Sequence, residues 1–171
     1  MIIAMNTKDN YLETLKYIAL HVRTEARVIL MSSISVYREF DMEVDEETSI
    51  SKIGLQYEAE QLIQNLKTHV ITLRLGGLMG EDRVAGRWSR VKNFTDGIVN
   101  YVHRDDVIGV VKNLIISDVS HGLFNVVAPL HPLRSQVHQN NAKKFGFEIG
   151  TFAGMSHRKV SSKRLLEDLD Y

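Results

Sequence analysis

The chain has 171 residues with 21 basic and 21 acidic side chains, so it lacks the basic excess of a dedicated nucleic-acid-binding protein. It contains no cysteine, which excludes disulfides, thiol nucleophiles and cysteine-ligated metal centres. Because it has neither a run of 18 apolar residues nor a signal-peptide pattern at its start, we expect a cytoplasmic protein without a nucleic-acid or membrane partner.

Short apolar runs alternate with segments of helical periodicity along the chain. The apolar runs predict strands buried on both faces, and we expect four main ones, at residues 1–5, 27–31, 69–75 and 122–128. Apolar residues that recur every three to four positions predict helices at 11–22, 51–67, 107–115, 133–145 and 161–171.

The intervening segments carry weaker signals. We expect an acidic loop at 39–47, a polar and irregular stretch at 81–99 and a short strand at 100–103. Asp105 or Asp106 stands directly before an apolar helical pattern, where an aspartate accepts a hydrogen bond from a free helical N–H. We therefore expect one of them to be the N-cap.

Strand–helix–strand alternation with apolar strands predicts an α/β fold with a parallel sheet and right-handed crossovers. Ligands of such sheets bind at the carboxyl ends of the strands. The residues that follow the predicted strands are therefore the candidate functional residues.

Two candidates directly follow central strands. Ser32 and Ser33 follow the second strand and can hydrogen-bond a substrate or a cofactor, or simply satisfy local backbone groups. Gly76 and Gly77 follow the third strand, where glycine allows a backbone to approach a ligand closely, although a plain glycine-rich connection is an equal reading.

Two further candidates are histidine-containing turns. His103 can contact a ligand, but the His-x-Asp-Asp spacing around it is not specific for a metal or an acid–base pair. His131 and Arg134 follow the last predicted strand and can bind an anionic substrate, although the same Pro-rich turn also suits a simple connector.

A Tyr-x-x-x-Lys pair would place a phenol and an ammonium on one helical face, where the lysine lowers the phenol's pKa for proton transfer. The chain contains no such pair, because no tyrosine is followed four positions later by lysine.

Several motifs in this order resemble the NAD-dependent epimerase/dehydratase family, also called the extended short-chain dehydrogenase/reductases. The motifs are VILMSSISVY, DEET, AEQL, ITLRLGGLMG, NYVHRDDVIGVV and GLFNVVAPLHP, and they span residues 1–135. The GGLMGEDR, VHRDDV and NVVAPLHPLR details look closest to an atypical, YeeZ-like subgroup of that family.

The resemblance implies a Rossmann-like sheet with flanking helices and NAD or NADP as the cofactor. Ser33 corresponds to the family's catalytic Ser or Thr, and Ser32 and Ser33 also adjoin the cofactor. Cofactor contact is further implied for Leu75, Gly76, Gly77 and Leu78, and substrate contact for His103, His131 and Arg134.

The chain departs from the family pattern in three ways, one of which is that Tyr37 is followed by Arg38 where the family has glycine. Aligning Ala59-Glu60 with the family's Ala-Glu places the catalytic Tyr and Lys positions on Lys52 and Gln56, so the usual proton donor is absent. The GxxGxxG strand–turn–helix that cradles the pyrophosphate is also absent. We therefore expect one partial, amino-terminally truncated Rossmann-like domain over 1–171, with a small substrate-side segment at about 129–171.

These observations leave two main hypotheses and a plainer third. The chain is part of an NAD(P)-dependent epimerase/dehydratase-like oxidoreductase that acts on a nucleotide-sugar or another hydroxyl/carbonyl compound, or it is an inactive half-Rossmann module that binds a partner or a small ligand. A structural domain without a ligand is the third.

Since strand 1–5 would lie at an exposed sheet edge, we also expect a homo-oligomer.

Overall fold

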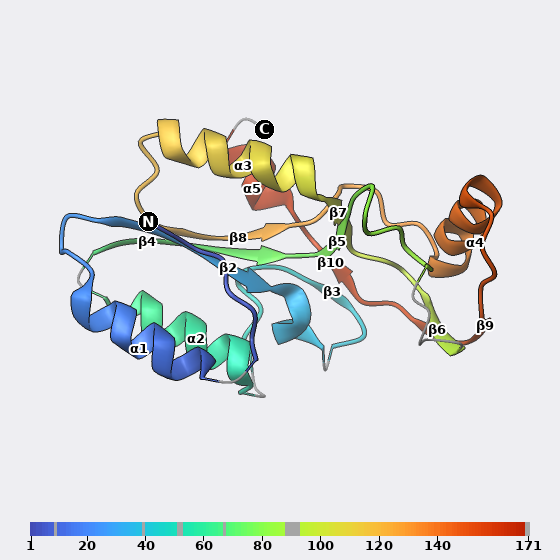
Figure 1. Ribbon diagram of the computed structural model, residues 1–171, viewed down its shortest axis with the longest axis horizontal. Helices are drawn as coiled ribbons and strands as arrows, with labels where there is room; N and C mark the ends of the chain where they lie inside the picture. The colour runs from blue at the N-terminus through green and yellow to red at the C-terminus, as the bar shows by residue number, and fades with distance from the viewer. Residues whose placement is uncertain (9, 39, 51–52, 67, 88–92, 170–171) are drawn as a thin grey trace.

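The computed structural model describes residues 1–171 except 9, 39, 51–52, 67, 88–92 and 170–171 (Figure 1). Its centre is a four-stranded, fully parallel sheet in the order β1-β2-β4-β8. The strands are β1 (Ile2–Ile3), β2 (Arg27–Ser33), β4 (His69–Leu75) and β8 (Gly122–Val126). The predicted α/β class and the four main strands are therefore confirmed, although β1 and β8 are shorter than expected.

Helices cover both faces of the central sheet (Figure 1). On one face, α1 (Tyr11–His21) and α2 (Leu55–Gln64) bury an apolar stripe that includes Leu15 and Ile63. On the other face, α3 (Arg104–Ile116) and α5 (Lys163–Leu169) pack around Phe124. The two apolar clusters show why these periodic segments fold as helices, since each buries one stripe against the sheet.

A smaller group of elements extends from the carboxyl ends of the strands (Figure 1). It comprises α4 (Arg134–Phe145), the short 3₁₀ helix η1 (Ile34–Tyr37) and three two-stranded parallel ladders. The ladders pair β3 (Glu43–Val44) with β10 (Lys159–Val160), β5 (Gly77–Met79) with β7 (Tyr101–His103), and β6 (Asn93–Gly97) with β9 (Thr151–Ser156).

Several local predictions were wrong. The stretch 81–99 contains β6 and the acidic loop 39–47 contains β3, because each is ordered by a distant partner strand that the sequence pattern does not reveal. The predicted helix 51–67 begins at Leu55, and positions 51, 52 and 67 lie outside the described residues.

The N-cap of α3 is also a correction. His103, not an aspartate, occupies the position, and its Nδ1 accepts a hydrogen bond from the N–H of Asp105 at 3.2 Å. Asp105 and Asp106 fall in the first helical turn instead, where a negative charge favours the helix dipole.

A charged cluster is buried between α2 and the sheet. Glu60 is 0 % exposed and Arg74 3 % exposed, and Arg74 Nη2 lies 2.7 Å from Glu60 Oε2. Arg74 Nε donates to both carboxylate oxygens at 3.0 and 3.2 Å, and the Ser32 hydroxyl donates to Oε1 at 2.5 Å. The carboxylate is therefore fully hydrogen-bonded, as a buried charge requires.

Tyr37 extends this cluster to the far side of β4. Arg74 Nη1 donates to the Tyr37 hydroxyl at 2.5 Å, and that hydroxyl lies 2.8 Å from the Asp45 carbonyl and 3.1 Å from Asn125 Oδ1. Burial raises the pKa of Tyr37, so the phenol stays protonated and remains available as a donor. The cluster thus ties α2, β4, η1 and β8 together.

No helix in the described part of the chain is long and apolar enough to cross a membrane.

The substitution Arg74→Met should lower the free energy of unfolding by roughly 3–5 kcal/mol, because Glu60 would stay buried without its counter-charge. Urea denaturation followed by circular dichroism measures this loss. Lys163→Met is the matched control, because its pair with Glu167 is exposed and should change stability by less than about 1 kcal/mol. Equal, small losses in both variants would contradict the expected role of the buried pair.

Candidate functional site

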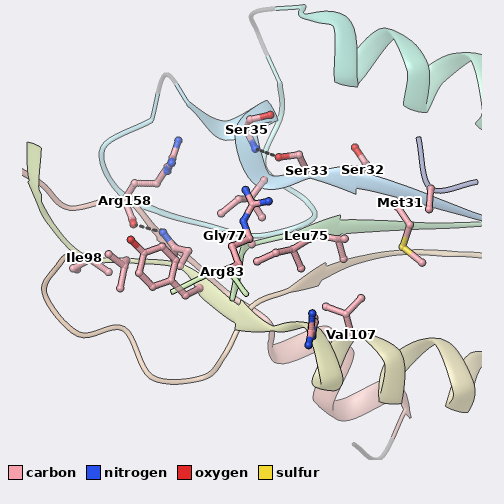
Figure 2. A pocket seen from close by; sticks show the side chains of 18 of the residues that line it. Met31, Ser32, Ser33, Ser35, Leu75, Gly77, Arg83, Ile98, Val107 and Arg158 are labelled. Carbon is pink, nitrogen blue, oxygen red and sulfur yellow. Dashed lines mark hydrogen bonds between the residues drawn. The ribbon is translucent and has the colours of Figure 1, made fainter. Parts of the chain in front are cut away.

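A cavity of about 750 Å³ opens at the carboxyl ends of β2 and β4 (Figure 2). This is the edge of a parallel sheet where ligands bind, and the volume lies within the range of small-molecule sites. Its wall draws on β2, β4, β5, β7 and α3 together with Arg134 at the start of α4 and with Ser156 and Arg158.

The two serines predicted from the sequence both line the cavity, but they are held differently. Ser32 donates its proton to Glu60 at 2.5 Å. Ser33 instead accepts a hydrogen bond from the Ser35 N–H at 3.1 Å and so caps η1, as the dashed line in Figure 2 shows. Ser33 therefore satisfies a local backbone N–H, Ser32 bonds a buried carboxylate instead, and both side chains line the cavity.

The segment from Leu75 to Leu78 brings a backbone to the cavity wall. The Gly76 N–H donates to the Val126 carbonyl at 2.9 Å, and the Gly77 N–H donates to the Asn100 carbonyl at 2.8 Å. A Cβ on Gly76 would lie 2.5 Å from that same carbonyl oxygen, which is a clash. The close approach of two backbones requires glycine at this position.

The cavity is electropositive. Its wall includes Arg83, Arg104, Arg134 and Arg158, and no carboxylate side chain among the described residues lines it. Arg104 is paired with Asp82 at 2.5 Å, but Arg158 Nε is buried without a hydrogen-bond partner in the structure. Burial, and after it the charge of Arg134, lowers the pKa of Arg158, which indicates an incompletely compensated positive charge.

His103 and His131 do not line this cavity, although every other site residue predicted from the sequence does. His103 is 43 % exposed and caps α3. His131 is half-buried, and burial lowers its pKa, so it is a neutral side chain at pH 7. Their assignment to a substrate remains a prediction.

Sequence reasoning missed several wall residues. Arg158 lies between β9 and β10, neither of which was predicted. Asn100 and Tyr101 lie at the start of the NYVH segment, which was expected to contain a strand but from which only His103 was chosen as a candidate. Their chemistry was visible in the sequence, but only the fold brings them to the ends of β2 and β4.

Tyr101 connects the cavity to a buried histidine. Its hydroxyl lies 3.0 Å from His138 Nε2, and His138 is 0 % exposed, with Phe94 and Phe152 packed against its ring. Burial, and after it the charge of Arg134, lowers the pKa of His138 to about 4. The imidazole is therefore neutral at physiological pH.

A second cavity of about 240 Å³ adjoins the first at Ser32 and Ser33. Gln56, which stands at the position expected for the family's catalytic lysine, lines this smaller cavity. Lys52, at the expected tyrosine position, lies outside the described residues. Among the described residues there is no group of three or more side chains placed to hold a metal ion.

Comparison with known proteins places these features in context. No family model matches the chain. It is 36 % identical over 133 residues to Protein YeeZ of Escherichia coli K12, an overlap of 74 % of this chain and 48 % of that protein. The chain thus spans about half the length of the curated relatives it matches.

Solved structures are similar over almost the whole chain. A functionally unknown conserved protein from Silicibacter pomeroyi has a TM-score of 0.77 at 17 % identity and matches 99 % of this chain and 71 % of its own. MoeE5 in complex with UDP-glucose and NAD has a TM-score of 0.73 at 16 % identity, over 95 % and 64 %. Human epimerase family protein SDR39U1 with NADPH has a TM-score of 0.71 at 14 % identity, over 98 % and 71 %.

The chain has a Rossmann-like α/β fold. The similarity to these structures and the order of the parallel strands confirm the predicted fold class.

The protein should lose stability as the pH falls from 6.5 toward 4, because the unfolded chain protonates His138 near 6.5 and the folded chain only near 4. The extra proton bound by the unfolded chain makes acidification favour unfolding within this window. Urea denaturation at a series of pH values measures the effect. His138→Gln should show a shallower decline than the wild type over the same window, and identical slopes would contradict the assignment.

Proposed function

We propose that the chain forms the catalytic side of a cytoplasmic NAD(P)-dependent oxidoreductase of the epimerase/dehydratase type. The observation that carries this proposal is the cavity at the ends of β2 and β4, which combines two serine hydroxyls, a glycine-enforced backbone wall and unpaired arginine charge. Similar structures that contain NAD or NADPH support the same reading.

The residues present fit a nicotinamide cofactor. The cavity is large enough for part of a dinucleotide. The segment Leu75–Leu78, which Gly76 and Gly77 allow to pack closely against Asn100 and Tyr101, forms part of its wall. When bound, the nicotinamide supplies a hydride donor or acceptor. The Leu75–Leu78 backbone would hold the nicotinamide end and orient it toward Ser33.

Ser33 is placed to hold the reacting oxygen of the substrate. Its oxygen accepts from the Ser35 N–H, which leaves its own proton to donate to a substrate carbonyl or hydroxyl oxygen. Such a hydrogen bond stabilises negative charge as it develops on that oxygen. No Tyr-x-x-x-Lys pair exists in this chain, so we assign no proton transfer to one.

We further propose that the substrate is a nucleotide-sugar or another anionic hydroxyl/carbonyl compound. Arg134 and Arg158 line the same cavity and repel each other, and a phosphate-bearing ligand would relieve this repulsion. MoeE5, one of the similar structures, is in complex with UDP-glucose.

NADH or NADPH should bind the purified protein with micromolar affinity, measured by the enhancement of nicotinamide fluorescence. Ala4→Trp should weaken this binding at least tenfold, because Ala4 is exposed at the cavity wall and a large side chain there narrows the site. Leu20→Trp, on the exposed face of α1, is the matched control and should bind normally. No binding by the wild type up to millimolar concentrations would overturn the proposal and favour a module without cofactor chemistry.

UDP-glucose should bind the wild type in isothermal titration calorimetry, and Arg158→Met should weaken binding about tenfold, since a hydrogen bond to a charged group contributes roughly 1.5–3 kcal/mol. The variant should remain as stable as the wild type, because Arg158 Nε has no hydrogen-bond partner to lose. Lys112→Met removes one charge from α3 outside the cavity and should leave binding unchanged. Unchanged affinity in Arg158→Met would contradict this anion site.

We also propose that the chain self-associates through β1. This strand lies at an edge of the central sheet, and Met1 and Ile2 are 51 % and 48 % exposed there. An apolar edge strand readily pairs with another chain. Light scattering at micromolar concentration should show a dimer or larger species, and Ile2→Lys should shift it toward the monomer. A wild-type monomer would refute this pairing.

A further inference from the structure

Asn100 is a buried polar side chain in the cavity wall, and it has no role in the function proposed above. It is 7 % exposed and directly precedes β7. Its side-chain amide makes two hydrogen bonds, both to the backbone of the segment that contains Arg158. Nδ2 donates to the Arg158 carbonyl at 2.9 Å, drawn as the dashed line at Arg158 in Figure 2, and Oδ1 accepts from the Val160 N–H at 2.8 Å.

These two bonds take the place of a neighbouring strand. In a parallel ladder, one residue bonds the C=O before and the N–H after its partner residue, and the Asn100 amide bonds the residues on either side of Lys159 in the same way. The other edge of β10 is paired with β3, because the N–H groups of Lys159 and Ser161 donate to that strand and its neighbour at 3.2 and 2.8 Å. Asn100 therefore completes the second edge of β10.

An amide is the side-chain group that suits this pair of bonds. One of its ends must donate to a carbonyl and the other must accept from an N–H, and the amide of asparagine carries both groups. An aliphatic side chain at this position would leave the Val160 N–H without its acceptor, and Val160 is 0 % exposed. The residue type at position 100 therefore fixes the backbone on both sides of Lys159.

The backbone of Arg158 is held in this way, whereas its guanidinium remains available to a ligand. Arg158 Nε is buried without a hydrogen-bond partner in the described structure, and the side chain lines the 750 Å³ cavity together with Arg134. A long side chain that meets an anion loses less entropy on binding if its backbone is already fixed. The bonds from Asn100 therefore prepare Arg158 for an anionic ligand before the ligand arrives.

Asn100 also connects Arg158 to the glycine wall of the cavity. Its backbone carbonyl accepts from the Gly77 N–H at 2.8 Å, and a Cβ on Gly76 would lie 2.5 Å from the same oxygen. The side chain of Asn100 thus bonds the segment of Arg158, while its main chain bonds the segment Leu75–Leu78. Two parts of the wall that are far apart in the sequence are held in one arrangement by a single residue.

We propose that Asn100 is a positioning residue that holds Arg158 in the cavity for the anionic group of the ligand. This inference rests on the proposed function, because it takes Arg158 as the residue that binds the anion. Asn100 contributes to the affinity through Arg158 and not through direct contact with the ligand.

The test is a double-mutant cycle with UDP-glucose as the probe, measured by isothermal titration calorimetry. Asn100→Ala should weaken binding about fivefold, less than the loss of about tenfold expected for Arg158→Met, because the guanidinium remains but is no longer held in place. In the Arg158→Met background, the same substitution should change the affinity by less than about twofold. Equal weakening in both backgrounds, or no weakening in either, would overturn the inference.

Asn125→Ala is the matched control. Asn125 is 0 % exposed and its Nδ2 donates to the Ser161 carbonyl at 3.1 Å, so it holds the same segment, but it does not line the cavity. This variant should be less stable and bind UDP-glucose normally, and a loss of affinity equal to that of Asn100→Ala would also overturn the inference. If Asn100→Ala does not fold by circular dichroism, Asn100→Ser replaces it in the cycle, because a hydroxyl can keep one of the two bonds.

The inference and the proposed function fail in different ways. Binding of UDP-glucose by the wild type, with losses in Asn100→Ala and Arg158→Met that simply multiply, overturns the role of Asn100 alone. A wild type that does not bind UDP-glucose overturns the proposed anionic substrate and the role of Asn100 with it.

Discussion

The buried ion pair between Glu60 and Arg74 is the constraint on which the arrangement of this protein depends. Desolvating two charges is unfavourable, and the pair is tolerated only because the carboxylate accepts from Arg74 and Ser32 and the guanidinium also donates to Tyr37. These directional bonds fix α2 against β4 and hold η1 at the end of β2. A purely apolar contact would leave these elements freer to slide, because hydrophobic attraction has no direction.

The same cluster gives the functional edge of the sheet its polarity. Ser32 belongs to both the buried cluster and the cavity wall, so the core determines what that hydroxyl presents to a ligand. Elsewhere in the wall, the positive charge of Arg134 acts on Arg158, and no carboxylate side chain lines the described part of the cavity. The site therefore combines a rigid polar end near the central sheet with a positively charged end near α4, which suits a ligand that is neutral at one end and anionic at the other.

The sequence pattern identified the parts of the fold whose order comes from local burial. The run RVILM and the segment HVITLRL are apolar enough to be read as buried strands, and both lie at the centre of the sheet. Strands β6 and β9 were not predicted because NFTDG and TFAGMS alternate neither in charge nor in hydrophobicity. They are ordered by pairing with each other, although β7, α3, β8 and α4 lie between them in the chain. The N-cap of α3 was mispredicted for a related reason. The preceding strand β7 sets the backbone geometry that places His103, and not Asp105, at the cap position.

By itself, the sequence determined the alternation of strands and helices and, through it, the position of Ser32, Ser33 and Gly76 at strand ends, because burial patterns are local and a parallel sheet gathers its carboxyl ends at one edge. Only the tertiary structure decided which distant side chains join them. Arg158 enters the cavity and His131 does not, although both are polar residues in turns. The direction of a turn side chain depends on packing between segments far apart in the chain, and that information is not contained in any short stretch of sequence.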